Sequence, residues 1–560
     1  MTKRFKFSII LACLSFAGGV LYTHTTNTLF PGLPIGVIVA AGILVAGSAL
    51  NRTQTTIGVG TIICLAVVSR LFAYSFPASM MRFDPDSHAV RSQVIIDSGG
   101  LGRIVPGFYQ TAAMFNVFGG EVALITNTPI DTAFAIFPIA VGLLLPLFAA
   151  IITRRVTTDT RAQTVAAAIV AVGGPSTMFG IAPIPITLAA IYLAGFIVMM
   201  LISDRQVGVA SFVVFGLFTL AAALTHKVSI LLLVGSTVIF TVYTGFVRYI
   251  DNRVPHSATT MITLFGILML ALQWLYLTEF FDRALVQIFK VIRLTNTSTA
   301  LEANDPTMAN VISRPLPIKL RNLSYFFITV GTGGLAAIEL FRRYRDYEVR
   351  LLQAAAASTV GIALPSLIGP GPGFQRVYIF ATVFVAALIG VGITRFACSG
   401  RPAARTIAAS VILLIIVTNP LGITAMPDFP GEPREYLSDE EVEAKHFANN
   451  NIDQVVYMDM YYGDEVVNFE RAARGDERHQ QTVPQPRWEP GLLSSELTQG
   501  TLLEHNYEYI AYRTDVENWR LEGGRYRLTW KPERKLAADP SYHVVYSNDG
   551  VTIHSYSYKY

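Results

Sequence analysis

The residues best suited to chemistry lie in one stretch, 82–91, which reads Arg-Phe-Asp-Pro-Asp-Ser-His-Ala-Val-Arg. The carboxylates of Asp84 and Asp86 can act as general bases on a hydroxyl group. Together with the imidazole of His88 they can also hold a divalent cation such as Mg²⁺ or Mn²⁺, if the reaction uses a metal. The alternative is a solvated loop in which the Asp-Pro pair only starts a turn.

The composition of the chain is that of a membrane protein. Of its 560 residues, 52% are hydrophobic and only 15% are charged, whereas soluble domains average about 25% charged residues. A formal net charge of +4 gives no reason to expect a nucleic-acid partner. The three cysteines, Cys13, Cys64 and Cys398, lie in or beside apolar segments. Their spacing indicates neither a metal site nor a disulfide framework.

Apolar segments long enough to cross a bilayer recur along the first three quarters of the chain, since a transmembrane helix needs roughly 20 mainly apolar residues. About thirteen are found: 7–23, 33–50, 56–75, 131–152, 163–179, 184–202, 207–224, 228–247, 258–277, 322–341, 351–368, 374–396 and 405–422. Because many spans follow the first, we expect it to be retained rather than cleaved as a signal peptide.

The distribution of positive charge predicts the orientation of these segments. Arginine and lysine fall in alternate connections, beginning at the N-terminus, and such connections stay in the cytoplasm. The other connections then face outward: 76–130 with Asp84, 278–321, and everything after about residue 423. In the second of these, 280–293 has apolar residues at helical spacing and predicts an interfacial helix. We therefore expect a multi-pass protein of the cell membrane, with its unusual polar residues outside.

The C-terminal part of the chain has the pattern of a separate domain. Short strand-like runs occur at 454–458, 507–513, 526–530, 543–546 and 551–556. Asn548-Asp549-Gly550 between the last two runs predicts a hairpin. We therefore divide the chain into a membrane domain, 1–423, and a soluble α+β domain outside the membrane, 424–560.

The stretch around Asp84 also resembles a known family. Phe83-Asp84-Pro85, His88 and Arg91, followed by Ile-Ile-Asp-Ser-Gly-Gly at 95–100, resemble the first external loop of the GT-C glycosyltransferases, and the archaeal oligosaccharyltransferase version above all. The resemblance is strong over about 25 residues and extends loosely, through span number and orientation, to the membrane domain. GT-C enzymes use sugars linked to lipid phosphates. The acidic residue of their loop is essential to catalysis, which implies Asp84 here, with Asp86 as the alternate.

Two departures from the oligosaccharyltransferase pattern bear on the substrate. Those enzymes carry a second acidic cluster that completes a metal site, but the corresponding stretch 173–183 contains no carboxylate. They also carry a Trp-Trp-Asp-Tyr-Gly motif in the external domain, to which 458–464 is only a coincidental approach. Both departures favour a transferase of single sugars over transfer to protein asparagine.

The remaining candidates are basic residues suited to the lipid phosphate. His226 and Lys227 follow Thr225 at the outer end of a predicted span, and a Thr-His pair there resembles archaeal and bacterial members of the family. Arg376 follows a Pro/Gly-rich turn, and guanidinium groups bind phosphate oxygens in pairs. His88 and Arg91 are also candidates for substrate binding, although Arg91 can equally pair with a nearby carboxylate. For the others, the alternative is simple interfacial anchoring.

The sequence thus predicts a mainly α, polytopic, GT-C-like membrane protein with a C-terminal extracytoplasmic α+β domain. The resemblance implies transfer of a monosaccharide, mannose being one candidate, from a dolichyl or other polyprenyl phosphate to a glycan or lipid-linked glycan, in an archaeal source. Phosphate is a good leaving group, so no cofactor is required. The alternatives are an oligosaccharyltransferase acting on asparagine and a non-enzymatic lipid-glycan flippase or transporter. Transporters, however, place polar groups mid-membrane, often with internal repeats.

Overall fold

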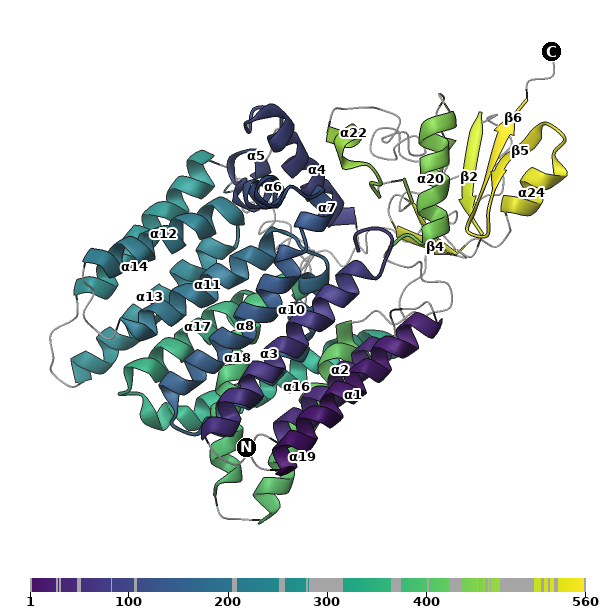
Figure 1. The fold of residues 1–560 in the computed structure, drawn as a ribbon. Helices are drawn as coiled ribbons and strands as arrows, with labels where there is room; N and C mark the ends of the chain where they lie inside the picture. Colours follow the sequence, from purple (N-terminus) through teal and green to yellow (C-terminus); the bar gives the residue numbers. More distant parts are fainter. Residues whose placement is uncertain are drawn as a thin grey trace.

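The structure, a computed structural model, consists of a helical bundle with a small α/β unit near one end (Figure 1). Every described element up to Ile423 is a helix, and all described strands follow it. The described residues are 3–26, 29, 32–47, 52–81, 83–104, 108–203, 209–250, 257–277, 281, 316–363, 374–399, 402–423, 436–452, 454, 456–458, 462–463, 465–473, 508–514, 518–521, 524–527 and 532–557.

The bundle is made of the apolar segments that the sequence predicts. Each of those segments coincides with one or two of the following helices. They are α1 (Lys3–Thr26), α2 (Gly32–Gly47), α3 (Arg52–Ser75), α8 (Ile136–Val156), α9 (Thr160–Val172), α10 (Gly174–Ile181), α11 (Pro185–Ile202), α12 (Val209–Thr225), α13 (Ser229–Ile250), α14 (Ser257–Ala271), the π-helix η1 (Leu272–Leu277), α16 (Leu316–Leu340), the 3-10 helix η3 (Phe341–Arg343), α17 (Tyr347–Ala363), α18 (Phe374–Ala397) and α19 (Pro402–Ile423). The predicted helical, polytopic class is confirmed.

The number of membrane crossings stays a prediction. Among the described residues, seven helices are long and apolar enough to span a bilayer, or eight if the bent pair α9 and α10 is one span. Four further apolar helices are shorter. The central helix is α18, because 94% of its most apolar window is buried, against 11% for α1. Arg376 in its first turn therefore lies where many helices end together.

The bend between α9 and α10 is stabilised by a buried arginine. The two helices meet at 48°, and Pro175, which has no N–H, follows the break. Arg70 of α3 is 1% exposed and donates hydrogen bonds to the carbonyls of Ala171 and Ser176, at 2.9 and 3.2 Å. The carbonyl of Ala171 is the one that Pro175 leaves without its helical donor. Arg70 thus replaces the lost helical hydrogen bond inside a span, where an unpartnered carbonyl is costly.

The predicted outer loop 76–130 contains three helices and the start of a fourth, so the alternative of a solvated loop around Asp84 is wrong. They are α4 (Phe83–Ser98), α5 (Phe108–Thr111), α6 (Met114–Thr126) and α7 (Ile130–Ala133), gathered at the top of Figure 1. Asp84, Pro85 and Asp86 form the first turn of α4. Proline is tolerated there, and carboxylates are favoured by the helix dipole. The Asp-Pro pair therefore begins a helix rather than a turn.

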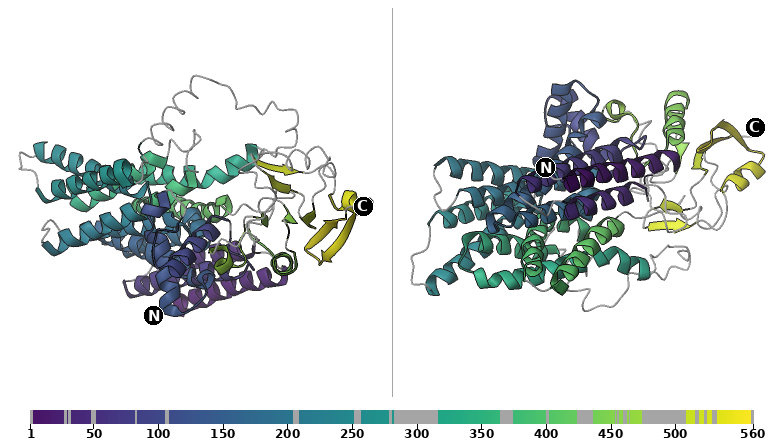
Figure 2. Two further views of the ribbon diagram at one scale, coloured as in Figure 1. Left: turned by 90° about the horizontal axis from the view of Figure 1, so that it is seen from above. Right: turned by 60° about the horizontal axis from the view of Figure 1, so that its bottom comes forward.

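The C-terminal unit contains a four-stranded sheet in the order β1-β2-β6-β5. Its strands are β1 (Val456–Tyr457), β2 (Tyr509–Arg513), β5 (Tyr542–Ser547) and β6 (Val551–Tyr556), and the predicted hairpin β5–β6 is confirmed. A two-stranded sheet pairs β3 (Asn518–Leu521) with β4 (Gly524–Arg527), and helices α20 (Asp439–Asn451), α22 (Phe469–Ala473) and α24 (Pro532–Ala538) accompany them. The yellow strands stay at one end of the bundle in both views of Figure 2.

The C-terminal unit contacts the predicted outer region directly. The backbone N–H of Leu437 donates to the hydroxyl of Ser79 at 2.8 Å, and α22 packs against α4. These contacts place the unit at the end of the bundle that carries α4. The predicted domain boundary near residue 424 and most of the predicted interfacial helix, 280–293, lie outside the described residues.

Candidate active site

The first turns of α4 and α18 bring two of the predicted residues into contact. The guanidinium of Arg376 forms a salt bridge and hydrogen bond with the carboxylate of Asp84 across 292 residues of sequence. Both side chains are partly exposed, at 49% for Arg376 and 34% for Asp84. The pair is therefore formed in the structure but still reachable by a substrate.

His88 lies one helical turn after Asp84, so the two side chains share a face of α4. It is 5% exposed, and its Nδ1 lies 3.0 Å from Oδ1 of Asn116 on α6. The same Nδ1 is 3.4 Å from a guanidinium nitrogen of Arg91. Burial and the charge of Arg91 lower the pKa of His88 to about 3, so the imidazole is neutral at physiological pH.

His226 lies in the turn between α12 and α13, where a serine satisfies freed backbone groups. The hydroxyl of Ser229 donates to the carbonyls of Ala222 and His226, both at 2.6 Å. The backbone N–H of Val228 donates to Nδ1 of His226 at 3.3 Å, which leaves the imidazole proton on Nε2. Burial and the charge of Lys227 lower the pKa of His226 to about 3. Its Nε2–H is therefore a neutral hydrogen-bond donor.

Electrostatic effects between these groups show that they lie in one region. Arg376 contributes to the lowered pKa of both His88 and His226, and His226 contributes to that of His88. The predicted substrate-binding residues His88, Arg91, His226, Lys227 and Arg376 thus come together from three separate parts of the chain: α4, the turn between α12 and α13, and the start of α18. Asp84 is paired with Arg376 and lies near the charge of Arg91, and two neutral imidazoles lie in the same region, an arrangement that suits an anionic phosphate group.

Asp86 lies elsewhere, because two positions along α4 turn its side chain about 200° from Asp84. It is fully buried and faces the C-terminal unit, where its Oδ2 accepts a hydrogen bond from the N–H of Val466 at 2.9 Å. Burial and the neighbouring carboxyl group of Glu465 raise the pKa of Asp86 well above its usual value. The hydrogen bond from Val466 joins α4 to the C-terminal unit through Asp86.

The same geometry bears on the predicted metal ligands. Asp84 and His88 are on one face of α4, and Asp86 is on the other, bonded to the C-terminal unit. Within the described part of the chain, no three His, Cys, Asp or Glu side chains are grouped to hold a metal ion. Asp84, Asp86 and His88 therefore do not form the metal site that their spacing suggested, because they belong to a helix rather than a loop.

Sequence reasoning missed two residues of this region. Asn116 is fully buried beside His88, and its signal was a lone amide in the apolar segment that became α6. Tyr109 has its ring 4.8 Å from that of His88 and 5.4 Å from the guanidinium of Arg91. Burial raises the pKa of Tyr109 to about 12. A single tyrosine in an outer loop carried no signal of this position.

Comparison with solved structures shows that the chain has a known fold, although its sequence gives no match. The sequence matches no family profile and no curated protein. Its structure is similar to the oligosaccharyltransferase of Archaeoglobus fulgidus, with a TM-score of 0.50 and 12% identity over 89% of this chain and 73% of that one. The chain has the GT-C fold.

Two other solved GT-C proteins align less well. ArnT from Cupriavidus metallidurans gives a TM-score of 0.45 and 12% identity, covering 88% of this chain and 97% of that one. The mycobacterial arabinofuranosyltransferase AftD gives 0.45 and 13%, covering 91% of this chain and 42% of that one. On the GT-C fold of the present chain, Asp84 and Arg376 lie at the end of the bundle that also carries the C-terminal unit.

Proposed function

We propose that this chain is a glycosyltransferase that moves a monosaccharide from a dolichyl or other polyprenyl phosphate to a hydroxyl group of a glycan or glycolipid acceptor. The observation that carries the proposal is the contact between Asp84 and Arg376, joined by the neutral imidazoles of His88 and His226. A base beside a cluster of phosphate-binding donors is what transfer from a sugar phosphate requires.

The proposed reaction is a direct displacement at the anomeric carbon. Asp84 accepts the proton of the acceptor hydroxyl as its oxygen forms a bond to that carbon. The bond between the carbon and the phosphate oxygen breaks, and the polyprenyl phosphate leaves with the electron pair. Arg376 and Lys227 stabilise the negative charge on the phosphate, and His226 donates a hydrogen bond through Nε2.

The salt bridge between Asp84 and Arg376 gives donor binding a role in preparing the base. A phosphate group that binds Arg376 competes with the carboxylate for the same guanidinium. Asp84 is then less strongly paired, and its carboxylate can accept a hydrogen bond from the acceptor hydroxyl. Asp86 has no place in this step, because it is buried against the C-terminal unit. Of the two predicted bases, we therefore propose Asp84.

The test is sugar transfer from a labelled polyprenyl-phosphate sugar by the purified full-length chain. We expect Asp84→Asn to lower kcat by roughly 10²–10⁴-fold, as removal of a general base does. Arg376→Gln should raise KM for the donor and lower kcat. The matched control is Asp97→Asn, at an exposed carboxylate near the end of α4 that accepts a hydrogen bond from Gln93.

Each other outcome has a defined meaning. Full activity of Asp84→Asn at wild-type expression would remove Asp84 from catalysis. Transfer to an acceptor peptide rather than to a glycan would support the oligosaccharyltransferase alternative. Absence of transfer with every donor, together with movement of a lipid-linked glycan across vesicles, would support the flippase.

A further inference from the structure

A second region of the bundle has the features of a binding site, and it lies away from Asp84. A pocket of about 340 Å³ opens between α2, α9, α18 and α19. Its lining consists of apolar side chains, one threonine and two arginines, Arg161 and Arg405. This volume falls at the lower end of the range for ligand sites, roughly 300–1,000 Å³. The N-terminus and the start of α19 lie at the end of the bundle opposite to α4 (Figure 1).

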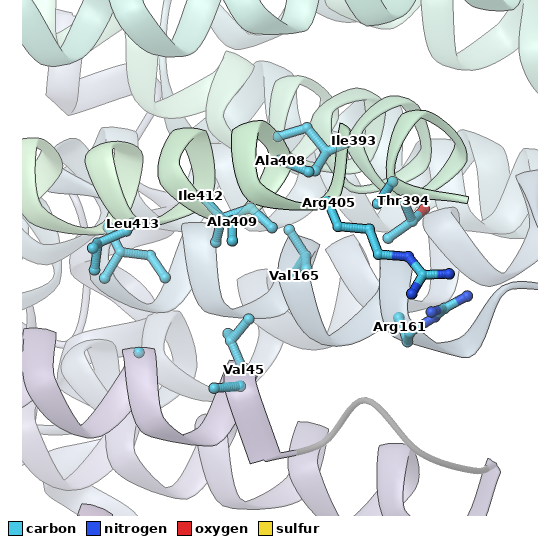
Figure 3. Close-up of a pocket in the computed structure, with 14 residues that line it drawn as sticks. Val45, Arg161, Val165, Ile393, Thr394, Arg405, Ala408, Ala409, Ile412 and Leu413 are labelled. Carbon is cyan, nitrogen blue, oxygen red and sulfur yellow. The ribbon is translucent and has the colours of Figure 1, made fainter. Parts of the chain in front are cut away.

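The two arginines come from different helices and lie at the same end of the pocket. Figure 3 shows both guanidinium groups there, with the side chains of Ala408, Ala409, Ile412 and Leu413 extending away along α19. Arg161 is paired with Asp159 at 3.2 Å and contacts Cys398. Arg405 has no ion pair or hydrogen bond to any residue that the structure describes. Its charge is therefore not neutralised by the described protein groups.

The length of the pocket indicates the kind of ligand. Ile416, the last lining residue, follows Arg405 by eleven positions along α19, which is about 16 Å at 1.5 Å per residue. Half of a hydrocarbon core of roughly 30 Å is nearly the same depth. Leu413 near the inner end is 56% exposed, so the pocket opens sideways, where hydrocarbon would surround the bundle.

We propose that this pocket binds one anionic phospholipid, with its phosphate between Arg161 and Arg405 and an acyl chain along α19. A soluble anion would make no contact with the apolar lining, and a neutral lipid would leave Arg405 without a counter-charge, since of the two arginines only Arg161 is paired with a carboxylate among the described residues. Basic pockets between transmembrane helices bind anionic lipid headgroups in this way. The proposal is independent of the sugar-transfer site, because the two lie at opposite ends of the bundle.

The test is native mass spectrometry of the full-length protein, with added phosphatidylglycerol or phosphatidylcholine. We expect tighter retention of one phosphatidylglycerol molecule. The double variant Arg161→Gln with Arg405→Gln should lower its affinity by about thirtyfold, since each arginine contributes about fivefold. Ala409→Trp, which fills the apolar part, should weaken retention of both lipids. The control Arg395→Gln changes an exposed arginine of α18 that does not line the pocket.

The proposal fails if the double variant retains phosphatidylglycerol as the wild type does, or if Arg395→Gln has the same effect as the double variant. It also fails if inorganic phosphate displaces phosphatidylglycerol at equal concentration, because the site would then recognise a soluble anion. A melting-temperature measurement without added lipid shows whether each variant is folded. If the double variant is unfolded, the single variant Arg405→Gln tests the proposal instead. We expect it to lower the affinity for phosphatidylglycerol about fivefold.

Discussion

Asp84 and Asp86 are two residues apart, yet the structure places them in opposite environments. Asp84 is partly exposed and paired with a guanidinium, whereas Asp86 is buried beside another carboxyl group. Burial and the neighbouring carboxyl group of Glu465 raise the pKa of Asp86 and favour its neutral form, although the charge of Lys445 acts in the opposite direction. The two environments differ because the helical geometry of α4 directs Asp84 and Asp86 to different faces of the helix.

The raised pKa of Asp86 predicts that stability depends on pH. A carboxyl whose folded pKa exceeds its unfolded value of about 4 stabilises the fold below that value. This contribution is lost as pH rises through the folded pKa. We expect Asp86→Asn, which can still accept the hydrogen bond from Val466 but carries no charge, to raise the apparent melting temperature more at pH 8 than at pH 5. Thermal unfolding of the purified protein measures this.

Asp97→Asn is the control for that measurement, because Asp97 lies on the same helix but is exposed. Its melting temperature should follow the wild type at both pH values. A wild-type protein that gains stability from pH 5 to pH 8 relative to Asp86→Asn would contradict the assigned direction. The lowered pKa of His88 acts with the opposite sign, since it destabilises the fold as pH falls below about 6.5.

The identities of the site residues were predictable because they break a local pattern. Asp84, His226 and Arg376 are ionisable groups beside apolar spans, where such groups are expensive. The burial of Asp86 was not predictable, because its hydrogen-bond donor Val466 lies 380 residues further along the chain. Asn116 became informative only when α6 was packed against α4. Sequence thus indicates which residues are unusual, and packing decides which of them meet.

At the scale of elements, breaks in helices position the site and the bundle. The break before α13 orients His226, and the break after α9 is held by Arg70. Arg70 lies inside a span that the sequence predicts correctly, but its role was not predicted. The reason is physical: its partners are backbone carbonyls, which leave no trace in side-chain sequence.

Arg70→Met should therefore destabilise the bundle. Removing a buried charge is by itself favourable, but the lost hydrogen bonds outweigh this gain. The carbonyls of Ala171 and Ser176 would lose their donor inside a span, and each unpartnered buried group costs roughly 1–3 kcal/mol. We expect a clear fall in the apparent melting temperature of the purified protein in detergent. Arg395→Met, at an exposed arginine near the end of α18, should change it little. Equal melting temperatures for Arg70→Met and wild type would show that the bend is stable without Arg70.

At the scale of the whole molecule, α4 and the C-terminal unit share one end of the bundle, and the N-terminus lies at the other (Figure 1). The positive-inside pattern predicts that the N-terminal end lies in the cytoplasm. Cys398 follows α18 at that same end and is exposed. Glu443 is an exposed residue of α20 at the opposite end. These two positions can report the orientation of the protein.

We expect a membrane-impermeant maleimide to label Glu443→Cys in intact cells, in a background where the three native cysteines are replaced by alanine. In a matched variant that keeps only Cys398, labelling should require permeabilised cells. The reason is that the reagent does not cross the membrane and, in intact cells, reaches only cysteines on its outer side. The reverse pattern would invert the orientation and place the site in the cytoplasm. Labelling of both positions after permeabilisation is the control for accessibility.

The architecture was more predictable than the contacts between its parts. Apolar segments predict where helices run because only helices satisfy their backbone groups in lipid, and turn chemistry predicts the hairpin β5–β6. The helix α4 was missed because its mean hydropathy is low and its proline suggested a turn. Its stability comes from packing against α6 and α22, and no local pattern encodes that packing.

The salt bridge between Asp84 and Arg376 also has a consequence for how the protein is made. Ribosomes add residues in order, and 292 positions separate the two partners. At roughly 5–20 residues per second, Asp84 enters the membrane about 15–60 s before Arg376 is synthesised. During that interval the nascent chain holds one half of the proposed reaction centre. A prematurely terminated chain that stops before α18 would therefore insert its early helices but lack Arg376. We expect such a truncated chain to be inactive in sugar transfer.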